Sequence, residues 1–109
     1  MAYDEGLAQR IKEFYKDVPN LEDKKMFGGV GYLYQGNMAC GVHKDKLIIR
    51  VGADDHEKAL AKEHTAVFDI TGRAMKGWVM VDAAGFENDE DLKEWVLWGL
   101  NFAKTLPAK

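Results

Sequence analysis

The chain of 109 residues is poor in the features that mark secreted, disordered or membrane proteins. Its single cysteine, Cys40, excludes an internal disulfide framework and fits a reducing compartment. Two prolines stand against 47% hydrophobic and 30% charged residues, which is typical of an ordinary globular chain. No apolar run approaches the roughly 20 residues that span a bilayer. We therefore expect a soluble protein with no membrane partner.

The N-terminal segment lacks the features of a targeting signal. Asp4 and Glu5 stand where a secretory signal carries positive charge. Together with the single cysteine, this favours a cytoplasmic location. A length of 109 residues is also close to the commonest size of one domain. We therefore expect one domain over residues 1–109, built on one hydrophobic core.

Charge is distributed unevenly, although the formal net charge is only −3. Residues 24 to 76 hold nine Lys and Arg against six Asp and Glu, whereas the segments before and after each hold three against six. Such segregation can give the folded protein a mildly basic face. The pI of about 5.6 is nevertheless far below the values typical of duplex-DNA binders, so autonomous binding to a phosphate backbone is disfavoured.

Two helices are predicted in the first two thirds of the chain. Apolar residues recur at helical spacing from about Asp4 to Asp17, and Pro19 ends the pattern. Asp54 or Asp55 can then cap a short helix that reaches about Glu63, because either carboxylate can satisfy open amides in the first turn. The apolar stripe of the first helix consists of Leu7, Ile11, Phe14 and Tyr15.

The last predicted helix has the clearest boundaries. Asn88, with Asp91 three residues later, matches an N-cap. The apolar pattern runs from Leu92 through Leu106, and Pro107 stops it.

Short runs separated by turn-forming residues predict a sheet between these helices. The runs are Lys24 to Phe27, Val30 to Tyr34, Met38 to Val42, Lys46 to Val51, Val67 to Ile70 and Lys76 to Val81. The order is one helix, four strands, one helix, two strands and one helix. This order predicts an α+β fold, a two-layer sandwich in which helices cover one face of a largely antiparallel sheet.

Four motifs follow one another in an order and spacing that point to a family. They are Lys24–Gly29, Gly36–Val42, Leu47–Gly52 and Thr71–Trp78, followed by a closing helix that contains Leu92, Trp95 and Val96. In this order they resemble the N-terminal domain of the TfoX/Sxy competence regulators over nearly the whole chain.

The resemblance implies an α/β fold with an antiparallel sheet and no cofactor. It also implies a family whose best-known members promote bacterial competence by acting with the cyclic-AMP receptor protein at promoters. Those regulators carry a second, C-terminal domain, whereas this chain ends at Lys109, directly after the predicted final helix. We carry over the fold and the general regulatory role, and no individual functional residue.

Residues that could carry chemistry have simpler structural interpretations. The glycine-rich stretch 28–31 lacks the Lys and Ser/Thr of a phosphate loop, so a turn or bulge is favoured. Cys40 and His43 could form a nucleophile and base, or two metal ligands, but three residues apart on a strand they point to opposite faces. A buried thiol is the better interpretation of Cys40. His56 and His64 lack further ligands at zinc spacing.

The acidic clusters 54–57 and 88–91 crowd predicted helix starts, where the helix dipole explains them without chemistry. No Ser-His-Asp arrangement, phosphate loop or dinucleotide fingerprint is present. We therefore predict no catalytic, cofactor-binding or metal-binding residues.

Basic and aromatic residues on the predicted strands form a first candidate surface. Cations and flat rings on an open sheet face suit either single-stranded nucleic acid or an acidic protein. The alternative is that the rings are core residues and the lysines solvate strand edges. The candidate residues are Lys24, Lys25, Arg50, Arg73, Lys76 and Trp78.

The last helix carries a second candidate surface. Leu97 lies opposite the apolar stripe of the helix, and Trp98 flanks the boundary. Both could anchor a homodimer or another partner, because tryptophan often dominates interface energy. The alternative is that Trp98 packs under the N-terminal helix and Leu97 is a lone exposed leucine.

These observations favour a non-enzymatic, TfoX-like binding module that acts through protein contacts, with the transcription machinery among the possible partners. A single-stranded nucleic-acid binder that uses the basic surface is the alternative function. A small-molecule sensor or small enzyme remains the third class, and it would require an enclosed polar pocket.

Overall fold

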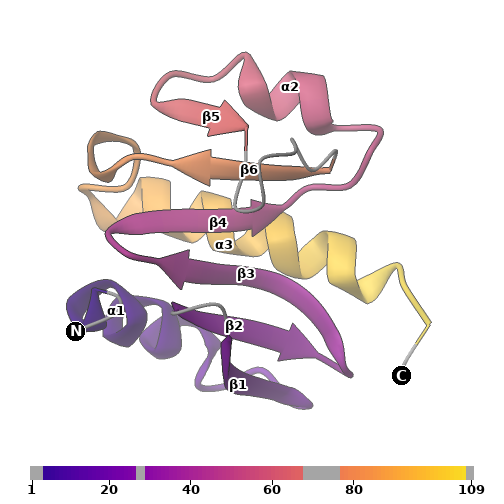
Figure 1. Cartoon of the computed structure of the whole chain (residues 1–109). Coiled ribbons are helices and arrows are strands. Elements are labelled where there is room, and N and C mark those ends of the chain that lie inside the picture. Colours follow the sequence, from indigo (N-terminus) through magenta and orange to yellow (C-terminus); the bar gives the residue numbers. More distant parts are fainter. Residues whose placement is uncertain (1–3, 27–28, 68–76, 108–109) are drawn as a thin grey trace.

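The computed structural model describes residues 4–26, 29–67 and 77–107. Figure 1 shows helices and strands in the predicted order, and the α+β fold is confirmed. The elements are α1 (Glu5–Tyr15), β1 (Leu21–Met26), β2 (Gly29–Tyr34), β3 (Asn37–His43), β4 (Lys46–Arg50), α2 (His56–Leu60), β5 (Thr65–Val67), β6 (Trp78–Val81), a 3-10 turn η1 (Ala83–Gly85) and α3 (Asp89–Lys104).

The six strands of the described residues form one antiparallel sheet in the order β1-β2-β3-β4-β6-β5. The first four strands form the predicted meander. The chain then leaves the sheet at β4 and passes through α2. It next forms the edge strand β5 and then β6, which lies between β5 and β4 and pairs with both.

Several boundaries differ from the predicted ones by a few residues. β1 begins at Leu21 rather than Lys24, because Leu21 already pairs with Tyr34 of β2. β4 ends at Arg50, two residues before Gly52, whose φ of 90° breaks the strand. The predicted strand from Val67 to Ile70 is observed as β5, which ends at Val67, and its other residues lie outside the described part.

Both long helices begin at caps that the sequence indicates. The Asp4 carboxylate accepts a hydrogen bond from the amide of Leu7 at 3.1 Å, which starts α1. The Asn88 side chain accepts from the amide of Asp91 at 2.8 Å, which starts α3 at Asp89, directly after the predicted N-cap. None of the helices within the described residues is both long enough and apolar enough to cross a bilayer.

The contacts of α1 and α3 place them on the same face of the sheet. Tyr32 and Cys40 pair across β2 and β3, so their side chains share a face. The Tyr32 hydroxyl donates to the carbonyl of Ala8 in α1 at 2.9 Å. Ile49 pairs with Cys40 on that face, and its side chain lies against Gly99 of α3. In Figure 1, α3 accordingly runs behind β3 and β4.

Residue alternation along β6 settles which face holds Trp78. Val79 and Val81 are fully buried in the core under the helices, whereas Trp78 and Met80 are half-exposed. Because neighbouring side chains alternate, Trp78 lies on the face that α1 and α3 do not cover. Arg50 pairs with Trp78 and starts on the same face, but its guanidinium also reaches the ring of Phe102 in α3.

Tyr15, the last residue of α1, joins the two long helices inside the core. It is 3% exposed, and its hydroxyl donates to the carbonyl of Val96 in α3 at 2.6 Å. Its ring also meets that of Tyr32 edge-on, with ring centres 5.9 Å apart. The hydroxyl is therefore a buried polar link between α1 and α3, and the ion pair of Arg10 with Asp89 at 3.1 Å is a second, more exposed one.

Tyr15→Phe should lower the free energy of unfolding by about 1–2 kcal/mol, because it removes a buried hydrogen bond and little volume. Urea unfolding followed by far-UV circular dichroism measures the change. Tyr34→Phe is the matched control, since the Tyr34 hydroxyl makes no hydrogen bond to any described residue. Equal losses in the two variants would show that the bond to Val96 contributes nothing.

Candidate binding groove between α2 and α3

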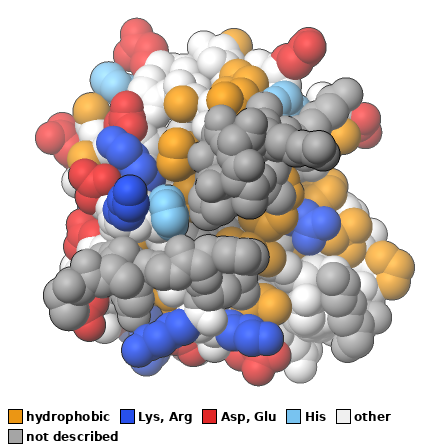
Figure 2. All heavy atoms as spheres, viewed as in Figure 1, with side chains coloured by type: hydrophobic (Ala, Val, Ile, Leu, Met, Phe, Trp, Pro, Cys, Tyr) orange, Lys and Arg blue, Asp and Glu red, His pale blue; other side chains and the backbone are white. Residues whose placement is uncertain are grey.

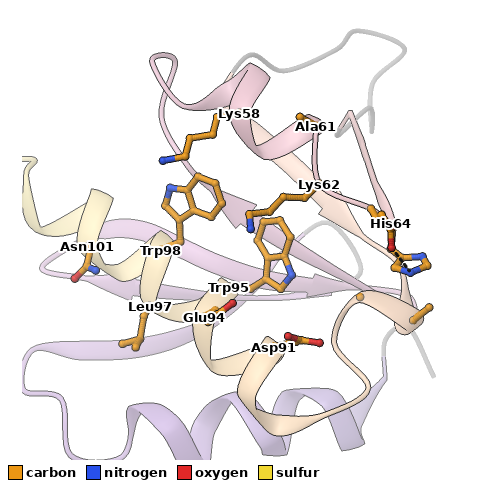
Figure 3. A pocket seen from close by; sticks show the side chains of 13 residues that line it. Lys58, Ala61, Lys62, His64, Asp91, Glu94, Trp95, Leu97, Trp98 and Asn101 are labelled. Atoms are coloured by element: carbon orange, nitrogen blue, oxygen red, sulfur yellow. Dashed lines mark ion pairs between the residues drawn. The ribbon is translucent and has the colours of Figure 1, made fainter.

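A hollow of about 970 Å³ opens to solvent between α2, η1 and α3. Figure 3 shows its side chains converging from these elements. We call this hollow the α2/α3 groove. It has three parts with different chemistry. They are an aromatic floor, a basic lip on α2 and the turn after it, and an acidic lip on α3.

Two tryptophans of α3 form the floor. Trp95 and Trp98 are three residues apart, so they lie on the same side of the helix. Their rings stack with centres 5.5 Å apart and an interplanar angle of 11°. Trp95 is buried, whereas Trp98 is half-buried. The floor is therefore a flat aromatic surface with its outer part accessible from the groove.

The indole of Trp98 also connects the two helices. Its Nε1 donates to Oδ2 of Asp55 at 3.2 Å. Asp55 occupies the N-cap position of α2 but its side chain caps no amide of that helix. The carboxylate therefore holds α2 against α3 instead of closing its own first turn.

The basic lip consists of Lys58 and Lys62. Their Nζ atoms lie 5.8 and 5.9 Å from the ring centre of Trp98. Such cation–π contacts contribute about 0.5–1 kcal/mol each at exposed sites. Neither ammonium group forms an ion pair with a described carboxylate. Two positive charges thus lie near the ring of Trp98, whose N–H donates to the Asp55 carboxylate.

The acidic lip consists of Asp91 and Glu94 in the first half of α3, where carboxylates are favoured by the helix dipole. Figure 3 shows Lys58 and Lys62 on one side of the two indoles and Asp91 and Glu94 on the other. Leu97 adjoins this lip and is 39% exposed, which is high for a large hydrophobic side chain.

The two residues predicted as partner contacts therefore lie together in the groove. Leu97 is exposed, as predicted from its position opposite the apolar stripe. Trp98 makes its ring and N–H contacts with α2 and α3, rather than under the N-terminal helix. Their role in binding a partner stays a prediction.

Sequence reasoning missed the basic lip and the part that Trp95 plays in the floor. The predicted short helix reached Glu63, whereas α2 ends at Leu60 and leaves Lys62 in the following turn. Five helical residues have too little periodicity to show which way Lys58 points. Trp95 was assigned to the apolar stripe, and it is indeed buried, but one edge also lines the groove.

The basic and aromatic surface is only partly assembled. The guanidinium carbon of Arg50 lies 5.2 Å from the ring centre of Trp78 and 5.5 Å from that of Phe102. Lys24 and Lys25 are exposed on the edge strand β1, and they pair with Gly31 and Val30, so they point to opposite faces.

Arg73 and Lys76 lie outside the described residues. In Figure 2, which views the face that α3 does not cover, Lys and Arg side chains gather in separate places along the lower edge, at the left and at the right. A continuous basic platform on this face stays a prediction.

Cys40 and His43 occupy different environments on β3. Cys40 is fully buried, with its Sγ 3.4 Å from the Tyr15 hydroxyl. Burial raises the pKa of the thiol to about 12, although the hydrogen bond with Tyr15 lowers it. His43 is half-buried, and by alternation along β3 its side chain lies on the opposite face from the thiol. The thiol is therefore protonated and enclosed.

The remaining histidines have separate surroundings. The Nδ1 of His56 accepts a hydrogen bond from the amide of Gly77 at 2.9 Å, which ties α2 to the start of β6. His64 is exposed, and its Nε2 lies 3.9 Å from a carboxylate oxygen of Glu63. Among residues 4–26, 29–67 and 77–107, no three His, Cys, Asp or Glu side chains are grouped to hold a metal ion.

Comparison with protein families gives one match. A model described as the TfoX N-terminal domain matches residues 13–103, which include every strand, α2 and nearly all of α3. Searches of curated proteins and of solved structures gave no significant match.

Cys40 should resist thiol reagents while the protein is folded. At pH 8 the labelling rate should be at least about a thousandfold lower than in concentrated urea, because reaction requires opening of the core. Since the pKa rises from 9.0 to about 12 on folding, the unfolded chain ionises first between these values. The contribution of the protonated thiol to the free energy of unfolding is thus complete below pH 9 and is lost as the pH rises from 9.0 to about 12. Rapid labelling of the native protein would contradict the buried placement.

The bond between Trp98 and Asp55 should appear in a double-mutant cycle. Trp98→Phe and Asp55→Ala should show a coupling free energy of about 1 kcal/mol in urea unfolding, because each change removes one partner of the same hydrogen bond. A parallel cycle with Asp54→Ala, the exposed neighbouring carboxylate, should give a coupling below about 0.5 kcal/mol. Similar coupling in both cycles would contradict a specific link between α2 and α3.

Proposed function

Because the chain belongs to the TfoX N-terminal domain family, we propose that it is a non-enzymatic regulatory module that works by binding another protein molecule. The observation that carries the proposal is the α2/α3 groove, in which exposed Leu97 adjoins the stacked rings of Trp95 and Trp98.

The composition of the groove supports a protein partner. Protein interfaces have an aromatic or aliphatic centre, and charged residues lie toward the rim. Here the indoles form the centre, and Lys58 and Glu94 lie on opposite rims. Buried tryptophan is also the residue type that most often dominates binding energy in such interfaces.

The shape of the groove supports recognition over catalysis. Electrostatic catalysis is strongest in a water-excluded site whose polar groups are fixed around the reacting atoms. The α2/α3 groove is open, and its floor consists of apolar rings. The thiol of Cys40 is enclosed on the core side of the sheet and is protonated at neutral pH, so it supplies no accessible nucleophile.

The regulatory part of the proposal rests on family resemblance. The best-known proteins that this chain resembles act with a transcription regulator at promoters. By analogy, we propose that the process this chain regulates is transcription in the cytoplasm.

A photocrosslinking amino acid at position 97 tests the proposal in cells that express the chain. We expect covalent adducts with protein at this position, because Leu97 is exposed beside the groove floor. The same amino acid at Lys12, an exposed position of α1, is the control and should give no matching adduct. Trp98→Ala, with its fold checked by circular dichroism, should reduce the adducts at position 97.

Adducts of equal intensity at both positions, or none at position 97, would refute the groove as a protein-binding surface. Adducts with nucleic acid in place of protein would support the single-stranded nucleic-acid alternative.

A further inference from the structure

Resting on the proposed function, we propose that the α2/α3 groove binds a second copy of this chain. Leu97 of each copy inserts into the groove of the other, around a two-fold axis. Two independent features of this surface support the dimer, which are its shape and the arrangement of its charges.

The shape argument is that one surface carries both a knob and a hole. Leu97 is the exposed apolar side chain, and the groove floored by Trp98 lies directly beside it on the same helix. A two-fold axis brings a patch against an identical copy of itself, so a protein needs complementary features on one patch to form such a dimer. An axis that lies in the interface plane, runs along the groove and passes between Leu97 and Trp98 places each leucine near the indoles of the partner copy.

The charge argument is that the two lips carry opposite signs. Lys58 and Lys62 line one side of the groove, and Asp91 and Glu94 line the other. A two-fold axis that lies in the interface plane and runs along the groove sets the basic lip of one copy against the acidic lip of the other. In the described part of the chain, none of these four side chains forms an ion pair. Asp91 accepts a hydrogen bond from the Asn88 side chain at 3.0 Å, and the two lysines contact the Trp98 ring, but no opposite charge is paired with any of the four in this part of the chain.

The opposite charges of the two lips also disfavour a partner whose charged residues all have the same sign. A uniformly acidic segment would meet Asp91 and Glu94 on one lip, and a uniformly basic segment would meet Lys58 and Lys62 on the other. The best match is a surface with both signs in the reverse order, and the chain itself presents that surface.

Sedimentation equilibrium at low salt tests the proposal with a charge exchange. The wild type should show a monomer–dimer equilibrium between about 1 µM and 1 mM, the range of weak to moderate interfaces. The variants K58E/K62E and D91K/E94K should each dimerise at least about tenfold more weakly, because like-charged lips then face each other. An equal mixture of the two variants should regain dimers, because every contact again joins opposite charges.

The design includes two safeguards. Lys12 of α1 and its C-cap residue Lys16 have the same four-residue spacing as Lys58 and Lys62, so K12E/K16E makes the same charge change away from the groove. It removes only the exposed ion pair of Lys16 with Glu13 and should dimerise as the wild type does. E94K alone spares the first turn of α3 and replaces D91K/E94K if that variant fails to fold by circular dichroism. Added salt should weaken wild-type dimers, because the lips are at the surface.

A wild type that stays monomeric over the whole range overturns this inference. If Leu97 then still crosslinks to a foreign protein, the proposed function stands and only the second copy is wrong. A dimer that K58E/K62E leaves unchanged, or a mixture that gains no dimer over the separate variants, also overturns it. A monomeric wild type with no crosslinked protein at position 97 refutes both.

Discussion

The close approach of α3 to the middle of the sheet is the constraint on which the rest of the structure depends. Gly99 faces β3, and a Cβ at this position would collide with the carbonyl oxygen of Ala39. Only glycine lets the helix lie this near the strand. The contact fixes the rotation of α3 about its axis, because Leu92, Val96 and Ala103 are buried on the same side. Leu97 is turned outward as a result, and Trp98 is turned toward α2.

Most of the fold could be predicted because its signals are local. Apolar spacing marks α1 and α3, the predicted cap Asn88 marks the start of α3, and turn residues separate the strands of the meander. The order of the strands in the sheet could not be predicted from the sequence pattern. β6 pairs with β4 as well as with β5, and no local signal indicates the pairing with β4. The face of Trp78 was undecided for a similar reason. Val79 and Val81 compete with Trp78 and Met80 for the core, and only the position of the helices decides between them.

The candidate site likewise contains some features that the sequence predicts and others that it does not. The outward position of Leu97 follows from helical periodicity, which is a property of one segment. The basic lip cannot be predicted in this way. Lys58 and Lys62 form a binding surface only with Trp98, which is more than 30 positions away in the sequence. Lys24 and Lys25 illustrate the opposite case. Their proximity in sequence suggested one patch, but strand alternation separates neighbouring side chains.

The path of the chain between β4 and β6 has a consequence for how the family can diversify. These two strands pair directly, whereas α2 and the edge strand β5 belong to the segment of chain that connects them. One lip of the groove is therefore carried by this connecting segment, and the other lip and the floor are carried by α3. Mutations in α2 can change which molecules are recognised while the packing of α3 on the central strands is preserved. Selection on specificity is thereby largely uncoupled from selection on folding.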